Sequence, residues 1–180
     1  MSSATAPAGT SAMAGGAGWG LAVLRVVAGV TWLHESAWKQ PPAFSALRSW
    51  VERPLEFPVF APYNAVVEAL ILPNLAAFGW LVYLTEAALG AFLIVGLATR
   101  LWAAVGAIMT VPIMLSVLNY SVTGDAGTLE EWSYAYYMML AIHVALFATA
   151  AGRGVALDGV LRPGWGASRH PVARLLVRLS

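Results

Sequence analysis

The chain has 180 residues, of which 59% are hydrophobic and only 11% are charged, whereas a soluble domain carries about 25% charged residues. This composition predicts an integral membrane protein. The formal net charge of +1 comes without a basic cluster other than the short C-terminal tail, so we exclude nucleic-acid binding.

The chain contains no cysteine, which limits its redox chemistry. It cannot form a disulfide, use a thiol nucleophile or hold an iron–sulfur cluster through thiolates. Any electron transfer must therefore use a bound carrier or another subunit.

The first residues differ from the rest of the chain. Residues 1–17 are small, uncharged and low in complexity, so we expect a disordered tail. A signal peptide would place positive charge before its apolar core, but the first arginine, Arg25, lies inside the core. We therefore expect no cleavage.

Four later stretches reach the length of about 20 apolar residues that a crossing helix needs. They cover residues 18–38, 75–98, 101–121 and 132–151. The predicted fold is all-α: an integral membrane four-helix bundle within residues 18–162, followed by a basic cytoplasmic tail at 163–180.

The arginines predict the orientation of the bundle. Arg100 lies in the tight turn between the second and third spans, and five arginines follow the fourth span, whereas the loop around residues 122–131 carries only acidic charge. The positive-inside rule then places both termini in the cytoplasm. Nine arginines against one lysine, with abundant Ala and Gly, are typical of a high-GC bacterial genome, so we expect a bacterial protein.

The first outer loop, residues 40–74, is too long for a simple turn and too apolar to be fully solvated. Residues 45–52 have amphipathic helical spacing, a series of prolines breaks this pattern, and residues 63–72 predict a second short helix. We expect the loop to lie on the membrane. It either packs over the mouth of the bundle or forms a lid over a lipid-soluble substrate.

Three ionisable residues lie inside apolar runs, namely Arg25, Glu86 and His143. A charge in hydrocarbon costs roughly 2.5–3.5 kcal/mol on insertion scales, so such a residue usually faces a partner or a cavity. Residues three or four apart share a helix face, which places Tyr83 beside Glu86 and Tyr136 on the helix of His143. Glycines on these stripes allow close helix approach.

Two interpretations of these residues remain open. In the first, Arg25 and Glu86 form an internal structural clamp. In the second, Glu86 or His143 acts catalytically by relaying a proton to a redox carrier such as quinone, in a pocket that Tyr83, Tyr136 and Arg25 help to form.

Other polar groups favour simpler structural interpretations. Pro112 predicts a kink in the third span, for which we favour helix packing over a ligand site. Glu35 and Lys39 have the order and spacing of an i,i+4 ion pair. No metal site is predicted: His34 lies near the surface and His143 near mid-membrane, so they cannot bind one haem iron, and zinc lacks ligands.

Several short motifs resemble the DoxX/DoxD family of small bacterial membrane proteins. They are Arg25-Val-Val-Ala-Gly29 followed by Trp38-Lys39, Glu86-Ala-Ala-Leu-Gly90 leading to Gly96-Leu-Ala-Thr-Arg100, and Gly152-Arg-Gly-Val-Ala-Leu-Asp158. The resemblance spans residues 21–162, and the proline-rich first loop is closer to the DoxD branch, associated with thiosulfate:quinone oxidoreductase.

The resemblance implies a plasma-membrane role in sulfur or redox metabolism, with partner subunits and quinone as electron acceptor. Our leading hypothesis is a membrane subunit of a quinone-linked oxidoreductase, surrounded by membrane lipid. The alternative is a non-catalytic scaffold that docks redox or detoxification proteins. The sequence does not separate the two, whereas a transporter is disfavoured because there is no internal repeat.

Overall fold

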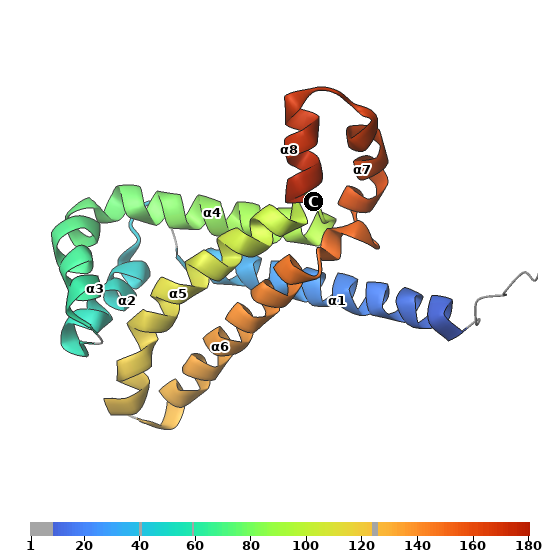
Figure 1. Cartoon of the computed structure of the whole chain (residues 1–180). Helices are drawn as coiled ribbons and strands as arrows, with labels where there is room; N and C mark the ends of the chain where they lie inside the picture. The colour runs from blue at the N-terminus through green and yellow to red at the C-terminus, as the bar shows by residue number, and fades with distance from the viewer. Residues whose placement is uncertain (1–8, 40, 59, 124–125) are drawn as a thin grey trace, which may run out of the picture.

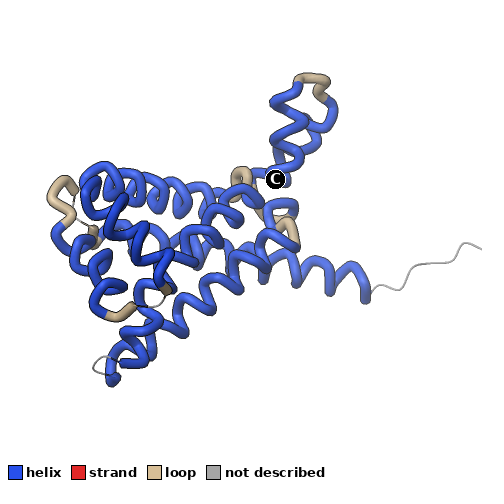
Figure 2. The backbone as a smooth tube through the Cα atoms, turned by 60° about the vertical axis from the view of Figure 1, so that its left-hand side comes forward, coloured by secondary structure: helices blue, strands red, loops and turns tan. Residues whose placement is uncertain are grey.

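The computed structural model describes residues 9–39, 41–58, 60–123 and 126–180, with side-chain detail for 16–39, 41–58, 60–118 and 133–180 (Figure 1). Within these residues the regular elements are helices, as Figure 2 shows, which confirms the all-α fold. The first eight residues, part of the predicted disordered tail, lie outside the described ranges.

Four long helices correspond to the predicted spans: α1 (Gly9–Ala37), α4 (Leu75–Val95), α5 (Thr99–Thr123) and α6 (Ala126–Ala148). Three helical stretches are long and apolar enough to cross a membrane, Gly16–Ala37, Ala61–Val95 and Thr99–Leu118, while α6 contributes the shorter apolar stretch Ser133–Ala148. The protein is thus an all-α membrane protein, and the number of four crossings stays a prediction. Helix α1 begins nine residues before the predicted start of the first span.

The bundle consists of two helix pairs, α1 with α4 and α5 with α6 (Figure 1). α4 and α5 meet at a tight turn, where Gly96 has a φ of 72° and Ala98 a φ of 50°. From this end, which we call the turn end, the pairs diverge toward the opposite end, which we call the loop end.

The loop end is covered by the predicted loop helices. α2 (Ser45–Glu56) confirms the amphipathic helix at 45–52 and continues past Pro54, packing against α5. α3 (Ala61–Val66) has Pro62 in its first turn. It continues as a π-helix over Val67–Ile71 and then as a 3₁₀ turn over Leu72–Asn74, after which α4 begins. The second predicted loop helix is therefore present, and the chain bends between it and α4 (Figure 1).

Glycine contacts explain how closely α1 and α4 pack. A Cβ atom added to Gly29 would lie 2.8 Å from the carbonyl oxygen of Gly90, and one added to Gly90 would lie 2.8 Å from the carbonyl oxygen of Gly29. Because neither position can hold a larger residue without displacing the partner backbone, the predicted role of these glycines is confirmed. The hydrophobic core of the bundle includes the buried side chains of Trp32, Leu89 and Leu146.

At the turn end, two buried charged residues satisfy the ends of two helices. Arg25, 3% exposed, donates to the carbonyl oxygens of Leu93 and Ile94 at the end of α4. Asp158, 0% exposed, accepts from the backbone N–H groups of Ala98 and Thr99, at 2.7 and 2.8 Å, where α5 begins. Each charge matches the sign of the helix terminus that it meets.

After α6, a 3₁₀ turn (Ala151–Arg153) leads to α7 (Leu157–Ala167) and α8 (Pro171–Leu179). These two helices form a hairpin that stands away from the bundle in both Figure 1 and Figure 2. We call it the C-terminal hairpin.

Candidate functional site

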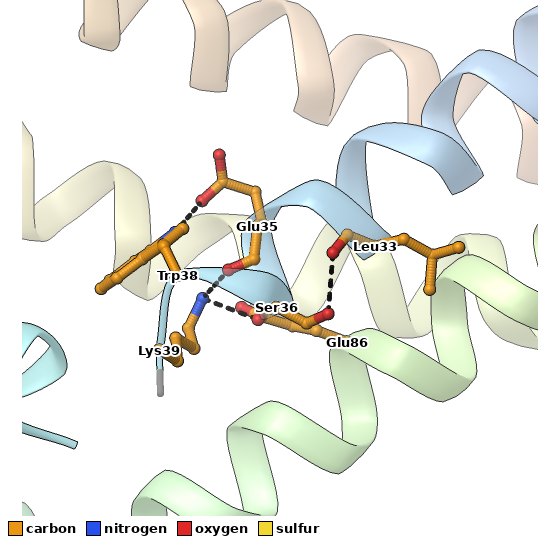
Figure 3. Close-up of polar contacts among 6 residues, drawn as sticks. All are labelled: Leu33, Glu35, Ser36, Trp38, Lys39 and Glu86. Atoms are coloured by element: carbon orange, nitrogen blue, oxygen red, sulfur yellow. Dashed lines mark hydrogen bonds and ion pairs between the residues drawn. The ribbon is translucent and has the colours of Figure 1, made fainter. Parts of the chain in front are cut away.

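The buried carboxylate of Glu86 is paired with a lysine. Lys39, just beyond the end of α1, places its Nζ 2.6 Å from Oε2 of Glu86, and the side chains are 3% and 0% exposed (Figure 3). The predicted Arg25–Glu86 pair is therefore wrong. Arg25 is occupied by the α4 carbonyls at the turn end, whereas Lys39 reaches Glu86 from the loop end.

Two further contacts hold Lys39 in place, and a third joins its neighbours Glu35 and Trp38. Its Nζ donates to the backbone oxygen of Glu35 at 2.9 Å and lies 4.3 Å from the centre of the Trp38 ring. The Glu35 carboxylate accepts from Nε1 of Trp38 at 3.0 Å (Figure 3). The predicted i,i+4 pair is thus replaced: the lysine binds the main chain of Glu35 and the carboxylate of Glu86.

The second carboxylate oxygen of Glu86 has unused hydrogen-bonding capacity. Within the part of the chain that the structure describes, Oε1 is buried and has no hydrogen-bond partner. Burying a neutral acceptor without a hydrogen bond costs about 1–3 kcal/mol of stability, and burying a charged acceptor in this way costs more. This oxygen is therefore suited to accept a hydrogen bond from a ligand.

The Lys39–Glu86 pair opens onto a cavity of about 570 Å³ at the loop end. This volume falls within the range of about 300–1,000 Å³ that is typical of small-molecule sites. The walls come from α2, from α3 with its π-helical continuation, and from α4 and α5, and Tyr136 of α6 completes them. Most lining side chains are apolar or aromatic, as in a site for a hydrophobic ligand with one polar end.

The loop is fastened over this cavity by two contacts. The Tyr63 hydroxyl donates to the carbonyl oxygen of Pro112 at 2.9 Å and lies 2.7 Å from the Ser116 hydroxyl. At the other side of the loop, the ring of Phe44 is 0% exposed and packs on Gly79 of α4. A Cβ atom added to Gly79 would lie 2.6 Å from this ring. The loop therefore packs over the bundle end and also covers a cavity, so the two interpretations of it are compatible.

His143 lies outside the cavity, in the core between α1, α5 and α6. Its Nε2 accepts from Nε1 of Trp32 at 2.9 Å. Its Nδ1 lies 2.8 Å from the carbonyl oxygen of Met139, which can only accept, so Nδ1 carries the proton. The ring also contacts the α5 backbone at Gly106. Both nitrogens are thus satisfied within the core.

Comparison with protein families identifies the chain. A family model described as "TQO small subunit DoxD" matches residues 56–176. The chain belongs to the DoxD family. No curated protein and no solved structure matches it. At the level of the family, this is a membrane subunit of the thiosulfate:quinone oxidoreductase type, which confirms the resemblance seen in the sequence motifs.

The matched range of this DoxD protein includes most of the cavity wall. It contains Tyr63, Glu86 and Tyr136, whereas Lys39 precedes it. The ion pair therefore joins a carboxylate from the matched region to a lysine from outside it.

The structure brings together two of the five predicted site residues of this DoxD protein. Glu86 and Tyr136 line the cavity, whereas Arg25 and His143 make the structural contacts described above. Tyr83 instead packs edge-to-face on Trp80, with ring centres 5.9 Å apart.

Sequence reasoning gave no site role to Tyr63 and Ser116 of this DoxD protein, and it gave Lys39 only as part of a family motif and as a partner of Glu35. All three residues line the cavity. For Lys39 a signal was available, because it is the single lysine of the chain and stands at the end of an apolar helix. Tyr63 and Ser116 lie 53 residues apart, and no local pattern connects them.

Proposed function

We propose that this protein is the membrane subunit of a quinone-linked oxidoreductase and that the cavity beneath α2 and α3 binds the quinone. A single observation carries this proposal. A fully buried carboxylate, one oxygen of which has no hydrogen-bond partner among the described residues, opens onto a largely apolar cavity of suitable volume. The match of residues 56–176 to the DoxD family is consistent with this assignment.

The polar groups of the cavity fit both forms of a quinone head group. Glu86 Oε1 would accept a hydrogen bond from a hydroxyl of the reduced form, and the Lys39 ammonium would donate to a carbonyl of the oxidised form. The aromatic and aliphatic walls would hold the ring and the start of an isoprenoid tail.

Bound quinone would supply a two-electron, two-proton couple, with the electrons delivered from thiosulfate by a partner subunit. In this proposal Glu86 holds a proton at Oε1 and passes it to the nearest ligand oxygen, and Glu86, once reprotonated, supplies the second proton of the couple. Lys39, with its Nζ 2.6 Å from Oε2, holds the side chain of Glu86 in place. Tyr63 and Phe44 keep the loop closed over the site, which excludes water. His143 takes no part in the relay, because the core satisfies both its nitrogens.

We further propose that the subunit lies in a bacterial plasma membrane with both termini cytoplasmic. The arginines support this orientation: Arg100 and the five arginines from Arg153 onward gather at the turn end. The cavity then lies toward the outer leaflet.

The test compares quinone binding by purified protein carrying Glu86→Gln with that by the matched control Glu68→Gln, which changes an exposed glutamate of the π-helical segment before α4. A hydrogen bond to a charged group is worth about 1.5–3 kcal/mol, so Glu86→Gln should weaken binding of the reduced quinone about ten- to a hundredfold. Glu68→Gln should bind like the wild type.

A second pair of variants leaves the ion pair intact. Val82→Phe, at a buried position on the cavity wall, should block binding by filling the cavity. Leu81→Phe, one residue away and 64% exposed, should not. If folded Glu86→Gln and Val82→Phe proteins keep full quinone binding, the non-catalytic scaffold becomes the better account.

A further inference from the structure

The C-terminal hairpin exposes apolar stripes that no part of the described chain covers. On α7, Leu157, Val160 and Leu161 are 38%, 74% and 37% exposed. On α8, Val172 and Leu175 are 54% and 53% exposed. Val160 and Leu161 lie three and four residues after Leu157, and Leu175 lies three after Val172, so each helix presents an apolar face.

Positive charge flanks these apolar stripes. Residues 151–180 contain five arginines and a single acidic residue, Asp158, whose carboxylate is buried against α5. Arg174 and Arg178 are exposed, four residues apart, on α8 beside Leu175. The surface of the hairpin is therefore basic and apolar at once, which is typical of helices that lie in a membrane interface.

The hairpin is a folded unit with a defined position. Arg162 on α7 donates to the backbone oxygen and the hydroxyl of Ser180, at 3.3 and 3.2 Å, and α8 also packs against α5. In Figure 1 both hairpin helices run across the direction of α1 and α4 at the turn end. If α1 and α4 cross a bilayer, this arrangement lays the hairpin along its surface.

We propose that the C-terminal hairpin is an interfacial anchor that inserts its apolar stripes into an anionic lipid surface. Lipid is favoured over a protein partner because exposed apolar residues of the spans, such as Val95 and Leu101, lie at the same end. The stripes would thus extend the lipid-facing surface of the bundle along the plane of the membrane. The arginines would meet the phosphate groups of anionic lipids. This inference is independent of the quinone proposal.

The lack of cysteine makes the test direct, because single-cysteine variants can be labelled without background. Val160→Cys and Leu175→Cys probe the two stripes. Gly166→Cys is the control, since it lies on the opposite face of α7 and a Cβ there meets nothing within 4 Å. The full chain is placed in nanodiscs of phosphatidylcholine with or without phosphatidylglycerol, and the labelling rate with a water-soluble maleimide is measured.

In anionic nanodiscs the two stripe cysteines should react far more slowly than Gly166→Cys. The combined change Arg174→Gln and Arg178→Gln should undo part of this protection, because each arginine near an anionic surface favours the docked state about fivefold, or about thirtyfold for two. Arg48→Gln, at the loop end, serves as the matched charge control and should leave the labelling rates unchanged.

Three results would overturn the proposal. The stripe cysteines could react as fast as Gly166→Cys in anionic nanodiscs. They could be equally protected in both lipid mixtures, which would remove the role of anionic lipid. They could become protected only when purified partner subunits are added, which would identify the stripes as a protein interface.

Discussion

Replacing Lys39 by methionine would leave the Glu86 carboxylate buried without its cation. Glu86 is 0% exposed, and its second oxygen has no partner within the described residues. Removing one partner of a buried ion pair typically costs about 3–5 kcal/mol. We expect Lys39→Met to lower the free energy of unfolding by about this amount, with a small part due to the lost bond to the Glu35 carbonyl.

Replacing both partners should recover most of this loss, because a buried pair exchanged for apolar residues of similar volume is often neutral. The double variant Lys39→Met with Glu86→Leu should therefore be more stable than Lys39→Met alone. The assay is reversible unfolding in detergent micelles, followed by tryptophan fluorescence, for the wild type, the two single variants and the double variant.

A second cycle, of Arg25→Gln with Glu86→Gln, provides the control. The α4 partners of Arg25 are Leu93 and Ile94, which lie seven and eight residues beyond Glu86 and so about 10–12 Å along the helix. Changes this far apart should add. Additive losses in the Lys39–Glu86 cycle, or strong coupling in the Arg25–Glu86 cycle, would refute the assigned pairing.

Three further predictions rest on other contacts of the structure, and a fourth rests on the distribution of the arginines. Asp158→Asn should destabilise the protein by about 1–3 kcal/mol in the same unfolding assay, because the amide keeps a single acceptor oxygen for two N–H groups. Tyr63→Phe should cost about 0.5–1.5 kcal/mol and speed hydrogen exchange in α3, and unchanged exchange would argue against the loop contact. His143→Phe should lower stability by leaving the Trp32 N–H unpaired, yet folded protein should bind quinone normally. A reporter fused after residue 180 should behave as cytoplasmic and one near residue 125 as extracytoplasmic, and the reverse would contradict the orientation.

The fold could be predicted from the sequence because its main signals are local. Runs of about 20 apolar residues define the long helices, and the spacing of apolar residues at 45–52 defines α2. Gly29 and Gly90 were predicted to allow close approach, and each contacts the partner backbone. The start of α1 at Gly9 was not predicted, because small uncharged residues were interpreted as disorder although alanine favours helix.

The pairing of the buried charges could not be predicted in the same way. More than one pairing was possible for the buried charges of Arg25, Glu86 and Lys39. The actual pairing depends on which helix end each side chain reaches. Arg25 donates to carbonyl oxygens at the end of α4, which have no partner within the helix. The pattern of apolar residues in the sequence does not reveal that these carbonyl groups need a donor. His143 was placed in the pocket because it is an ionisable residue in an apolar run on the helix of Tyr136, whereas its side chain points toward Trp32.

The cavity is the least predictable feature, because it depends on how two helix pairs diverge. The sequence placed a pocket under the first outer loop, bounded by Tyr83, Glu86, Tyr136 and His143. Of these four residues, Glu86 and Tyr136 line the cavity. The contacts that close it join Tyr63 to Pro112 and Ser116, which are about fifty residues away in the chain. Contacts between residues so far apart in the chain produce no periodic pattern in a single sequence.

Photochemical labelling by a quinone tests most directly whether the cavity is the binding site. Purified protein in nanodiscs is irradiated with a short-tailed azido-quinone, and the labelled peptides are mapped by mass spectrometry with and without excess unlabelled quinone. We predict that competable label falls on residues of the cavity wall, such as Trp38, Val67 and Tyr136, and disappears in Val82→Phe but not in Leu81→Phe. Label spread over the lipid-facing side chains, unaffected by competitor or by Val82→Phe, would contradict the proposed quinone site.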